Sequence, residues 1–185
     1  ALFVLLNFNQ ITIMLALSSM PLAFTYPLMK RFTYWPQLFL GITFNYGLIL
    51  GWTAIRGEID IIPIVFYFGA IFWTLAYDTI YGFQDIKDDE IIGVKSTSIK
   101  FKKNPTQLLL ICLLIFSTTL LMTGYMMNFN YLYFLSLLFV FFHLFFYQIK
   151  KFDSKNTKNC LKIFKSNNHL GLFIYFSLLI GKLNL

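Results

Sequence analysis

The sequence predicts an all-α membrane protein, a polytopic transmembrane helical bundle of about six spans with a short apolar stub at its start. Of the 185 residues, 58% are hydrophobic and 20% aromatic, whereas only 12% are charged. Soluble domains carry about twice that share of charged residues. The apolar residues also gather into runs of about 20, the length that crosses the hydrocarbon core of a bilayer. No linker separates the runs, so residues 1–185 are predicted to form a single membrane-embedded domain.

Six of the apolar runs are long enough to be membrane spans. In chain order they are 11–27, 36–55, 61–81, 108–127, 131–149 and 170–185. The stub, residues 2–8, is too short to cross a bilayer and is expected to be the end of an earlier helix. In the second span, Gly47 and Gly51 form a small-xxx-small pair, which is expected to allow close contact with another helix.

The basic residues are distributed unevenly between the two ends of this bundle. Thirteen of the 15 Lys and Arg residues follow the first, third and fifth spans, and only Arg56 and Lys182 lie on the other side. By the positive-inside rule, the lysine-rich loops face the cytoplasm or the mitochondrial matrix and the C-terminus lies outside. We therefore expect an integral protein of the bacterial or mitochondrial inner membrane, surrounded by membrane lipid. The lysines form no continuous basic stripe, so no nucleic-acid partner is expected.

The loop after the third span carries an unusual group of carboxylates. Asp78, Asp85 and Asp89 are spaced at i, i+7 and i+11, which places them on one face if the helix continues through them. Tyr81 shares that face, and Asp88 flanks it. Ionisable groups at the edge of a membrane are costly to desolvate, so their presence indicates a functional site. The alternative is a solvated loop whose aspartates are offset by neighbouring lysines.

The same carboxylates suggest a metal ion. Like charges crowded on one face repel each other, and a hard divalent cation with oxygen ligands relieves the repulsion. Mg²⁺ suits this pattern, because it usually binds through one or two carboxylates together with phosphate oxygens. The sequence has no EF-hand loop that would favour Ca²⁺.

A few other polar residues allow both a structural and a functional interpretation. Lys30 and Arg31 either anchor a helix end at the membrane interface or neutralise a bound diphosphate, and Lys95 is a similar candidate. Asn45, in the middle of a span, either bonds to another helix or contacts a ligand. His143 is expected to be a buried hydrogen-bonding residue, and His169 to lie near a capped helix start. The two cysteines, Cys112 and Cys160, lack metal-site spacing and are not expected to form a disulfide.

Three segments resemble the UbiA superfamily of membrane prenyltransferases, in its 4-hydroxybenzoate polyprenyltransferase branch. The most specific is DTIYGFQDIKDDEIIGVKST at 78–97, which is similar to the second aspartate-rich motif of that family. The others are YPLMKRFTYWPQLFLGITFNYG at 26–47 and SNNHLGL at 166–172. The resemblance covers essentially the whole chain.

The resemblance implies transfer of a polyprenyl group from polyprenyl diphosphate to the aromatic ring of 4-hydroxybenzoate, an early step of ubiquinone synthesis. It further implies Mg²⁺ ions that bridge two aspartate motifs and the diphosphate. On this chain the carboxylates of the second motif are Asp78, Asp85 and Asp89, with Asp88 as a helper. The implied substrate-binding residues are Tyr26, Lys30, Arg31, Asn45, Tyr81 and Lys95.

One feature of the family is missing from the sequence. Its members have nine transmembrane helices and a first motif of the form NDxxDxxxD, and no such motif occurs here. The chain is therefore expected to correspond to the later helices and to be inactive alone. It would work with a separately encoded N-terminal part, or be an inactive remnant of such an enzyme. A small transporter is disfavoured, because its charges would be spread along several spans rather than gathered at one edge.

Overall fold

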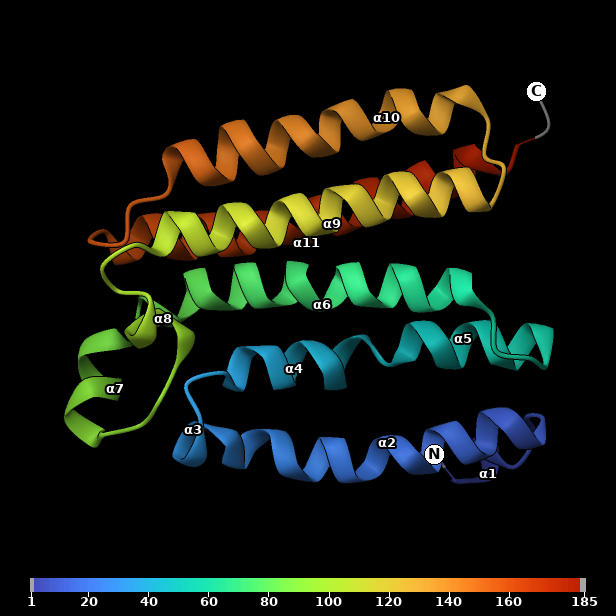
Figure 1. Ribbon diagram of the computed structural model, residues 1–185, viewed down its shortest axis with the longest axis horizontal. Coiled ribbons are helices and arrows are strands. Elements are labelled where there is room, and N and C mark those ends of the chain that lie inside the picture. Colours follow the sequence, from blue (N-terminus) through green and yellow to red (C-terminus); the bar gives the residue numbers. More distant parts are fainter. Residues whose placement is uncertain (1, 184–185) are drawn as a thin grey trace.

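The computed structural model describes residues 2–183, and helices alone form its regular structure over that range. Figure 1 shows the long helices lying side by side, with two short helices projecting at one end. The elements are α1 (Leu2–Leu5), α2 (Gln10–Thr25), the 3-10 turn η1 (Tyr26–Leu28), α3 (Met29–Phe32), α4 (Pro36–Asn45), α5 (Gly47–Arg56), α6 (Ile61–Gly82), α7 (Ile86–Ile92), α8 (Thr97–Lys100), α9 (Pro105–Met126), α10 (Tyr131–Phe142), the π-helical η2 (His143–Ile149) and α11 (Thr157–Gly181).

Five of the predicted spans are confirmed as helical stretches long and apolar enough to cross a membrane. Within the described residues these are Gln10–Phe32, Pro36–Arg56, Ile61–Gly82, Pro105–Met126 and Tyr131–Ile149. The first extends α2 through η1 into α3, and the second is divided by a break at Tyr46 between α4 and α5. The predicted all-α polytopic bundle is therefore correct.

The sixth predicted span is not among these five helices, and its predicted start was wrong. A single helix, α11, runs from Thr157 to Gly181 and so includes the polar stretch before Leu170. Asn156 caps it, accepting a hydrogen bond from the backbone of Asn159. His169 therefore lies well inside a helix and not near its start. Residues 184–185 of the predicted span lie outside the described part.

Short polar side chains begin several of these helices. Asn9, Asp60, Ser96 and Asn130 each accept a hydrogen bond from a backbone N–H of the first turn of the helix that follows. Such caps satisfy donors that have no partner within the helix. These four caps fix where α2, α6, α8 and α10 start.

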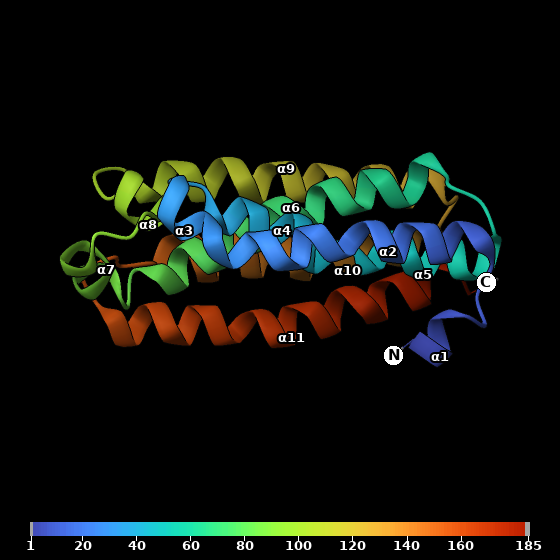
Figure 2. The same ribbon diagram turned by 90° about the horizontal axis from the view of Figure 1, so that it is seen from below.

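The core is built around α6, which packs against α4, α9 and α11. Figure 2 shows α9 and α11 on opposite sides of the bundle, with α4 and α6 between them. Helices α6 and α9 approach each other closely at Gly69, where an added Cβ would lie 2.8 Å from Thr119 Cβ. Gly47 and Gly51 do not have the predicted role, because an added Cβ at either would meet no described atom within 4 Å.

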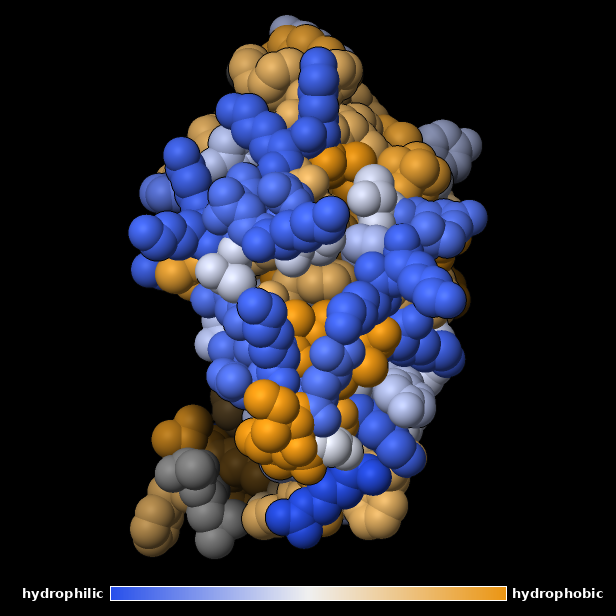
Figure 3. Space-filling view, turned by 90° about the vertical axis from the view of Figure 1, so that its left-hand side faces the viewer, coloured by the Kyte–Doolittle hydropathy of each residue, from blue (hydrophilic) through white to orange (hydrophobic). Residues whose placement is uncertain are grey.

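The charged residues gather at the end of the bundle where α7 and α8 project. Figure 3 looks onto this end and shows hydrophilic side chains over most of its surface. Thirteen of the 15 basic residues lie in α3, α7, α8 and the first part of α11, or in the loops next to these helices. The predicted separation of charge between the two ends is therefore present in the fold.

Candidate functional site

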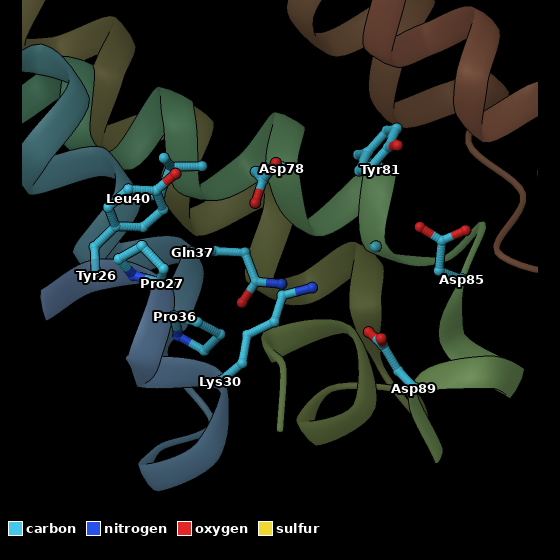
Figure 4. Close-up of a pocket in the computed structure, with 11 residues that line it drawn as sticks. Tyr26, Pro27, Lys30, Pro36, Gln37, Leu40, Asp78, Tyr81, Asp85 and Asp89 are labelled. Carbon is cyan, nitrogen blue, oxygen red and sulfur yellow. The ribbon is translucent and has the colours of Figure 1, made fainter. Parts of the chain in front are cut away.

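A cavity of about 370 Å³ opens at the charged end, between α6, α4 and the segment from η1 to α3. Six residues proposed from the sequence line it: Tyr26, Lys30, Asp78, Tyr81, Asp85 and Asp89. The other lining residues are Pro27, Pro36, Gln37, Leu40 and Gly82. Figure 4 shows Lys30 reaching toward the space bordered by the three carboxylates.

The carboxylates come together in a different way from the one predicted. Helix α6 ends at Gly82, and Asp85 is the residue before α7 begins. Asp78 thus lies on α6 and Asp89 on α7, so the expectation that they share one continuous helix face was wrong. The turn at Phe83–Asp85 bends the chain and brings α7 around the cavity (Figure 4).

The segment after α7 is held against α4 and α6 by buried hydrogen bonds. Gln37 Oε1 accepts from the backbone N–H of Thr97 at 3.0 Å, and Ser98 Oγ donates to Thr79 O at 2.8 Å. Ser96, Thr97 and Ser98 are fully buried. These hydroxyl residues end the aspartate-rich segment, and sequence reasoning assigned them no role. Their burial fixes the path of the loop that carries two of the carboxylates.

Two glycines are needed for the path of the loop between α6 and α8. Gly93 ends α7 in the left-handed conformation, with φ of 79°. Gly82 lies against Ser98, where an added Cβ would be 3.3 Å from Ser98 Cβ. A larger residue at 82 would therefore push the loop away from α6 and widen the cavity.

Lys95 contributes through its backbone and does not line the cavity. Its N–H donates to Lys30 O at 2.8 Å, and its ammonium donates to Phe32 O at 3.2 Å. These bonds tie the loop to the segment that carries Lys30. Arg31 and Asp88 are exposed and are also outside the lining. Three of the proposed polar residues are thus near the cavity but not part of its wall.

Asn45 lies at a second cavity, also of about 370 Å³, which is bordered by α4, α6 and α11. The lining residues are Phe44, Asn45, Trp73, Thr74, Tyr77, Phe164, Asn167, Asn168 and Gly171. Asn45 Nδ2 faces three acceptors, Gly41 O, Ala70 O and Thr74 Oγ1, at 2.8, 3.2 and 2.7 Å. The predicted bond between helices is therefore confirmed, and the residue also borders a space for a ligand.

Sequence reasoning missed the polar cluster at this second cavity. Asn167 Oδ1 accepts from Trp73 Nε1 at 2.8 Å and from Gln148 Nε2 at 2.9 Å, which joins α11 to α6 and η2. The Gln148 amide nitrogen also lies 3.3 Å from His143 Nδ1, as expected for a hydrogen-bonding histidine. The SNNHLGL segment was the part of the sequence that could have indicated this cluster: its first asparagine, Asn167, is buried, whereas His169 is exposed.

The carboxylates do not form a ready-made metal site. Between residues 2 and 183, no three His, Cys, Asp or Glu side chains are grouped closely enough to hold an ion. Asp78, Asp85 and Asp89 instead border one cavity from separate elements. This donor set fits a cation that takes only one or two carboxylates and completes its coordination with phosphate oxygens and water. Cys112 and Cys160 are both buried and free.

Comparison with known proteins places the chain among membrane prenyltransferases. The chain matches the model of the UbiA prenyltransferase family over residues 1–177. It is 42% identical over 184 residues to "4-hydroxybenzoate polyprenyltransferase, mitochondrial" of Bos taurus, covering 99% of this chain and 49% of that protein. Proteins of the same name from Homo sapiens and Dictyostelium discoideum are 41% and 38% identical, and the matches cover 49% and 39% of their lengths.

The chain thus spans about half the length, or less, of these curated relatives. No solved structure matches it. The family match extends over nearly all of the chain and includes every residue of the carboxylate cavity. The chain belongs to the UbiA prenyltransferase family.

Proposed function

We propose that the chain is the later part of an enzyme that transfers a polyprenyl group from its diphosphate to the ring of 4-hydroxybenzoate in ubiquinone biosynthesis. The single observation that supports this most strongly is the cavity at the charged end, where Lys30 faces Asp78, Asp85 and Asp89. Diphosphates are recognised by cations and by carboxylate-bound metal ions, and this cavity offers both kinds of group. The names of the relatives give the substrates.

Each side chain of the cavity has a distinct role in this proposal. Asp78, Asp85 and Asp89 hold Mg²⁺, with Asp88 as an outlying helper. Lys30 neutralises the charge that the metal leaves on the diphosphate, and Arg31 adds positive charge nearby. Tyr26 and Tyr81 orient the phosphate oxygens. Lys95 positions Lys30 through the backbone bond described above.

The reaction requires stabilisation of a leaving diphosphate. The carbon–oxygen bond to the prenyl group breaks, and both electrons leave with the diphosphate. The ring carbon next to the hydroxyl of 4-hydroxybenzoate forms the new carbon–carbon bond and then releases its proton. Mg²⁺ supplies charge stabilisation to the leaving group, which is the main catalytic term expected for such chemistry. Lys30 adds to this stabilisation.

The charge distribution suggests the orientation in the membrane. The carboxylate cavity lies at the end with most of the basic residues, so the positive-inside rule places it on the cytoplasmic or matrix side. The relatives are named as mitochondrial proteins, which favours a mitochondrial membrane. A polyprenyl diphosphate would enter from the lipid, with its charged group at this face.

The chain is proposed to need a further segment for activity. It lacks the NDxxDxxxD motif that the resemblance implies, and it spans about half of its relatives. With half of the expected carboxylates absent, the charge that develops on the leaving diphosphate would be stabilised too little for turnover. A partner polypeptide or an upstream segment with that motif would complete the site, whereas an inactive remnant would have none.

The test is prenylation of 4-hydroxybenzoate in membranes that carry the chain, alone and together with a segment bearing NDxxDxxxD. We expect Mg²⁺-dependent product only in the combined membranes, and we expect Asp78→Ala or Asp85→Ala to abolish it. The matched control is Glu58→Ala, which removes an exposed carboxylate from the loop at the opposite end of the bundle. Full turnover after both aspartate substitutions would reject the site.

A further inference from the structure

We propose that one face of α11 binds an acidic phospholipid. This lysine face consists of Lys158, Lys162 and Lys165, which are all exposed and are spaced at i, i+4 and i+7 of the helix. The phosphate of the lipid lies between these lysines, and an acyl chain follows the helix below them. The inference does not depend on the proposed function, because the lysine face lines neither of the cavities described above.

The lysine face points away from the rest of the bundle. The buried residues of α11 include Ile163 and Asn167, and the residues that border the second cavity include Phe164 and Asn168. The lysines belong to neither row. Figure 2 shows α11 along one edge of the bundle. The remaining side of the helix, which carries the lysines, therefore faces away from the described helices.

The lysine face has no counter-charge in the described part of the chain. No described carboxylate lies within 4 Å of its ammonium groups. Other lysines at this end of the bundle do have contacts. Lys95 donates to a backbone oxygen, Lys100 lies 4.4 Å from the centroid of an aromatic ring, and Lys102 pairs with Glu90. Like charges at this spacing on a helix repel each other, so an anion bound between them is stabilising.

The lysine face stands at the level of the lipid headgroups. Gln148 is at the end of the span Tyr131–Ile149 and donates to Asn167 Oδ1 at 2.9 Å, so this bond marks where the apolar part of the bundle ends. Lys165 and Lys162 lie roughly 3 and 8 Å beyond Asn167, toward the start of α11, at 1.5 Å per residue. The headgroup layer is about 5–8 Å thick on each side of a bilayer. The ammonium groups are therefore within reach of phosphates.

The same side of α11 becomes apolar below the lysines. Leu172 and Phe176 follow Lys165 at i+7 and i+11, and they are 54% and 49% exposed. The face thus offers cations at headgroup level and a hydrocarbon surface beneath them, which is the order of groups in a phospholipid. Clusters of basic residues beside a membrane helix bind acidic headgroups. A soluble phosphate would use only the lysines and would leave the apolar part uncovered.

A phospholipid in this position would set the depth of α11 in the membrane. The helix carries Asn167, whose Oδ1 accepts hydrogen bonds from Trp73 on α6 and from Gln148 on η2. These bonds form only when α11 stands at the correct height beside its neighbours. The lipid would therefore support the junction of α11 with the bundle from the outside.

The first test is native mass spectrometry of the purified chain, titrated with phosphatidylglycerol or with phosphatidylcholine of the same acyl chains. We expect saturable binding of phosphatidylglycerol that is at least roughly tenfold tighter than that of phosphatidylcholine. Lys162→Gln with Lys165→Gln should remove most of this preference. The matched control, Lys102→Gln with Lys103→Gln, removes the same charge from exposed positions of another loop and should keep the preference within about threefold. Glycerol phosphate without acyl chains should not compete.

The second test locates the acyl chain. A bimane label is attached through Phe176→Cys on the lysine face or, as the matched control, through Phe139→Cys on the exposed side of α10, since the native cysteines are buried. Phosphatidylglycerol with a spin-labelled acyl chain, at a low fraction in phosphatidylcholine nanodiscs, should quench the label at 176 more strongly than at 139. Lys162→Gln with Lys165→Gln should remove the difference.

Four outcomes would overturn the proposal. Equal losses in the two double-lysine variants would indicate general attraction by positive charge. Equal quenching at positions 176 and 139 would leave no lipid on this face. Competition by an unreactive thio-linked prenyl diphosphate would assign the lysines to a substrate. Loss of the preference when the segment bearing NDxxDxxxD is present would show that this segment covers the face. Circular dichroism should be the same for all variants, because every substituted residue is exposed.

Discussion

Asn167 provides a sharp test of how α11 is joined to the rest of the bundle. Its side chain is 7% exposed, and its Oδ1 accepts two bonds from other elements, from Trp73 and from Gln148. Asn167→Leu leaves both donors without this acceptor. Bonds between helices in membranes contribute about 0.6 to 1.7 kcal/mol each, because the unfolded chain finds other partners. We therefore expect a loss of about 2 kcal/mol in the free energy of unfolding.

The assay is unfolding of the purified chain by sodium dodecyl sulfate in mixed micelles, followed by circular dichroism. The matched control is Asn168→Leu, which changes the neighbouring exposed residue and should alter stability by less than about 0.5 kcal/mol. Combining Asn167→Leu with Trp73→Phe should cost less than the sum of the two single changes, because they remove the same bond. Equal losses for the two asparagines would refute the reasoning.

Three further predictions concern packing and charge at other places. Gly69→Ala should lower the free energy of unfolding by about 1–3 kcal/mol through crowding against Thr119, and Gly69→Ala combined with Thr119→Gly should cost less than the sum of the two single changes. Gly47→Ala should raise stability by roughly 0.5–1 kcal/mol, because the added methyl meets open space and helical glycine is unfavourable; a loss at this position would contradict the described packing. Lys102→Ala removes the 2.7 Å ion pair with Glu90, whose partners are 55% and 39% exposed. The free energy of unfolding of the variant should therefore differ from that of the original chain by less than about 1 kcal/mol at low salt, and by less at high salt.

Much of the fold could be predicted because the bilayer constrains it strongly. A span needs about 20 apolar residues, and five of the predicted runs match the structure closely. The start of α11 was not predicted, because its first half carries several lysines and has too few apolar residues to be recognised as part of a membrane span. Its buried residues nevertheless recur every three or four positions, from Cys160 through Ile163 and Asn167 to Leu170. Helical periodicity was the better signal there.

The sequence predicted which residues form the candidate site better than it predicted how they are arranged. The grouping of Asp78, Asp85 and Asp89 around one cavity agrees with the sequence, but a helix break rather than a shared helix face produces it. The partner of these carboxylates, Lys30, is distant in sequence, and its position depends on the backbone bond to Lys95. Such contacts between distant segments leave no local pattern in a single sequence.

The glycine predictions failed for a related physical reason. A small-xxx-small spacing shows where helices are able to approach, but the facing helix decides whether they do. An added Cβ at Gly47 or Gly51 would meet no described atom within 4 Å, whereas Gly69 has Thr119 directly against it. The polar cluster of Trp73, Gln148 and Asn167 was missed because its residues lie on three elements that are far apart in the sequence. Only Asn167 lies in a segment that the sequence analysis singled out.

The most direct test is equilibrium binding of an unreactive thio-linked farnesyl diphosphate to the chain in nanodiscs, measured by calorimetry with Mg²⁺ and then with excess chelator. We expect binding that the chelator abolishes and that Asp78→Asn or Asp85→Asn weakens by at least roughly tenfold, with Glu58→Gln unchanged. Binding that is equally strong without Mg²⁺, or that is insensitive to both aspartate substitutions, would contradict the assignment of these carboxylates to a metal diphosphate.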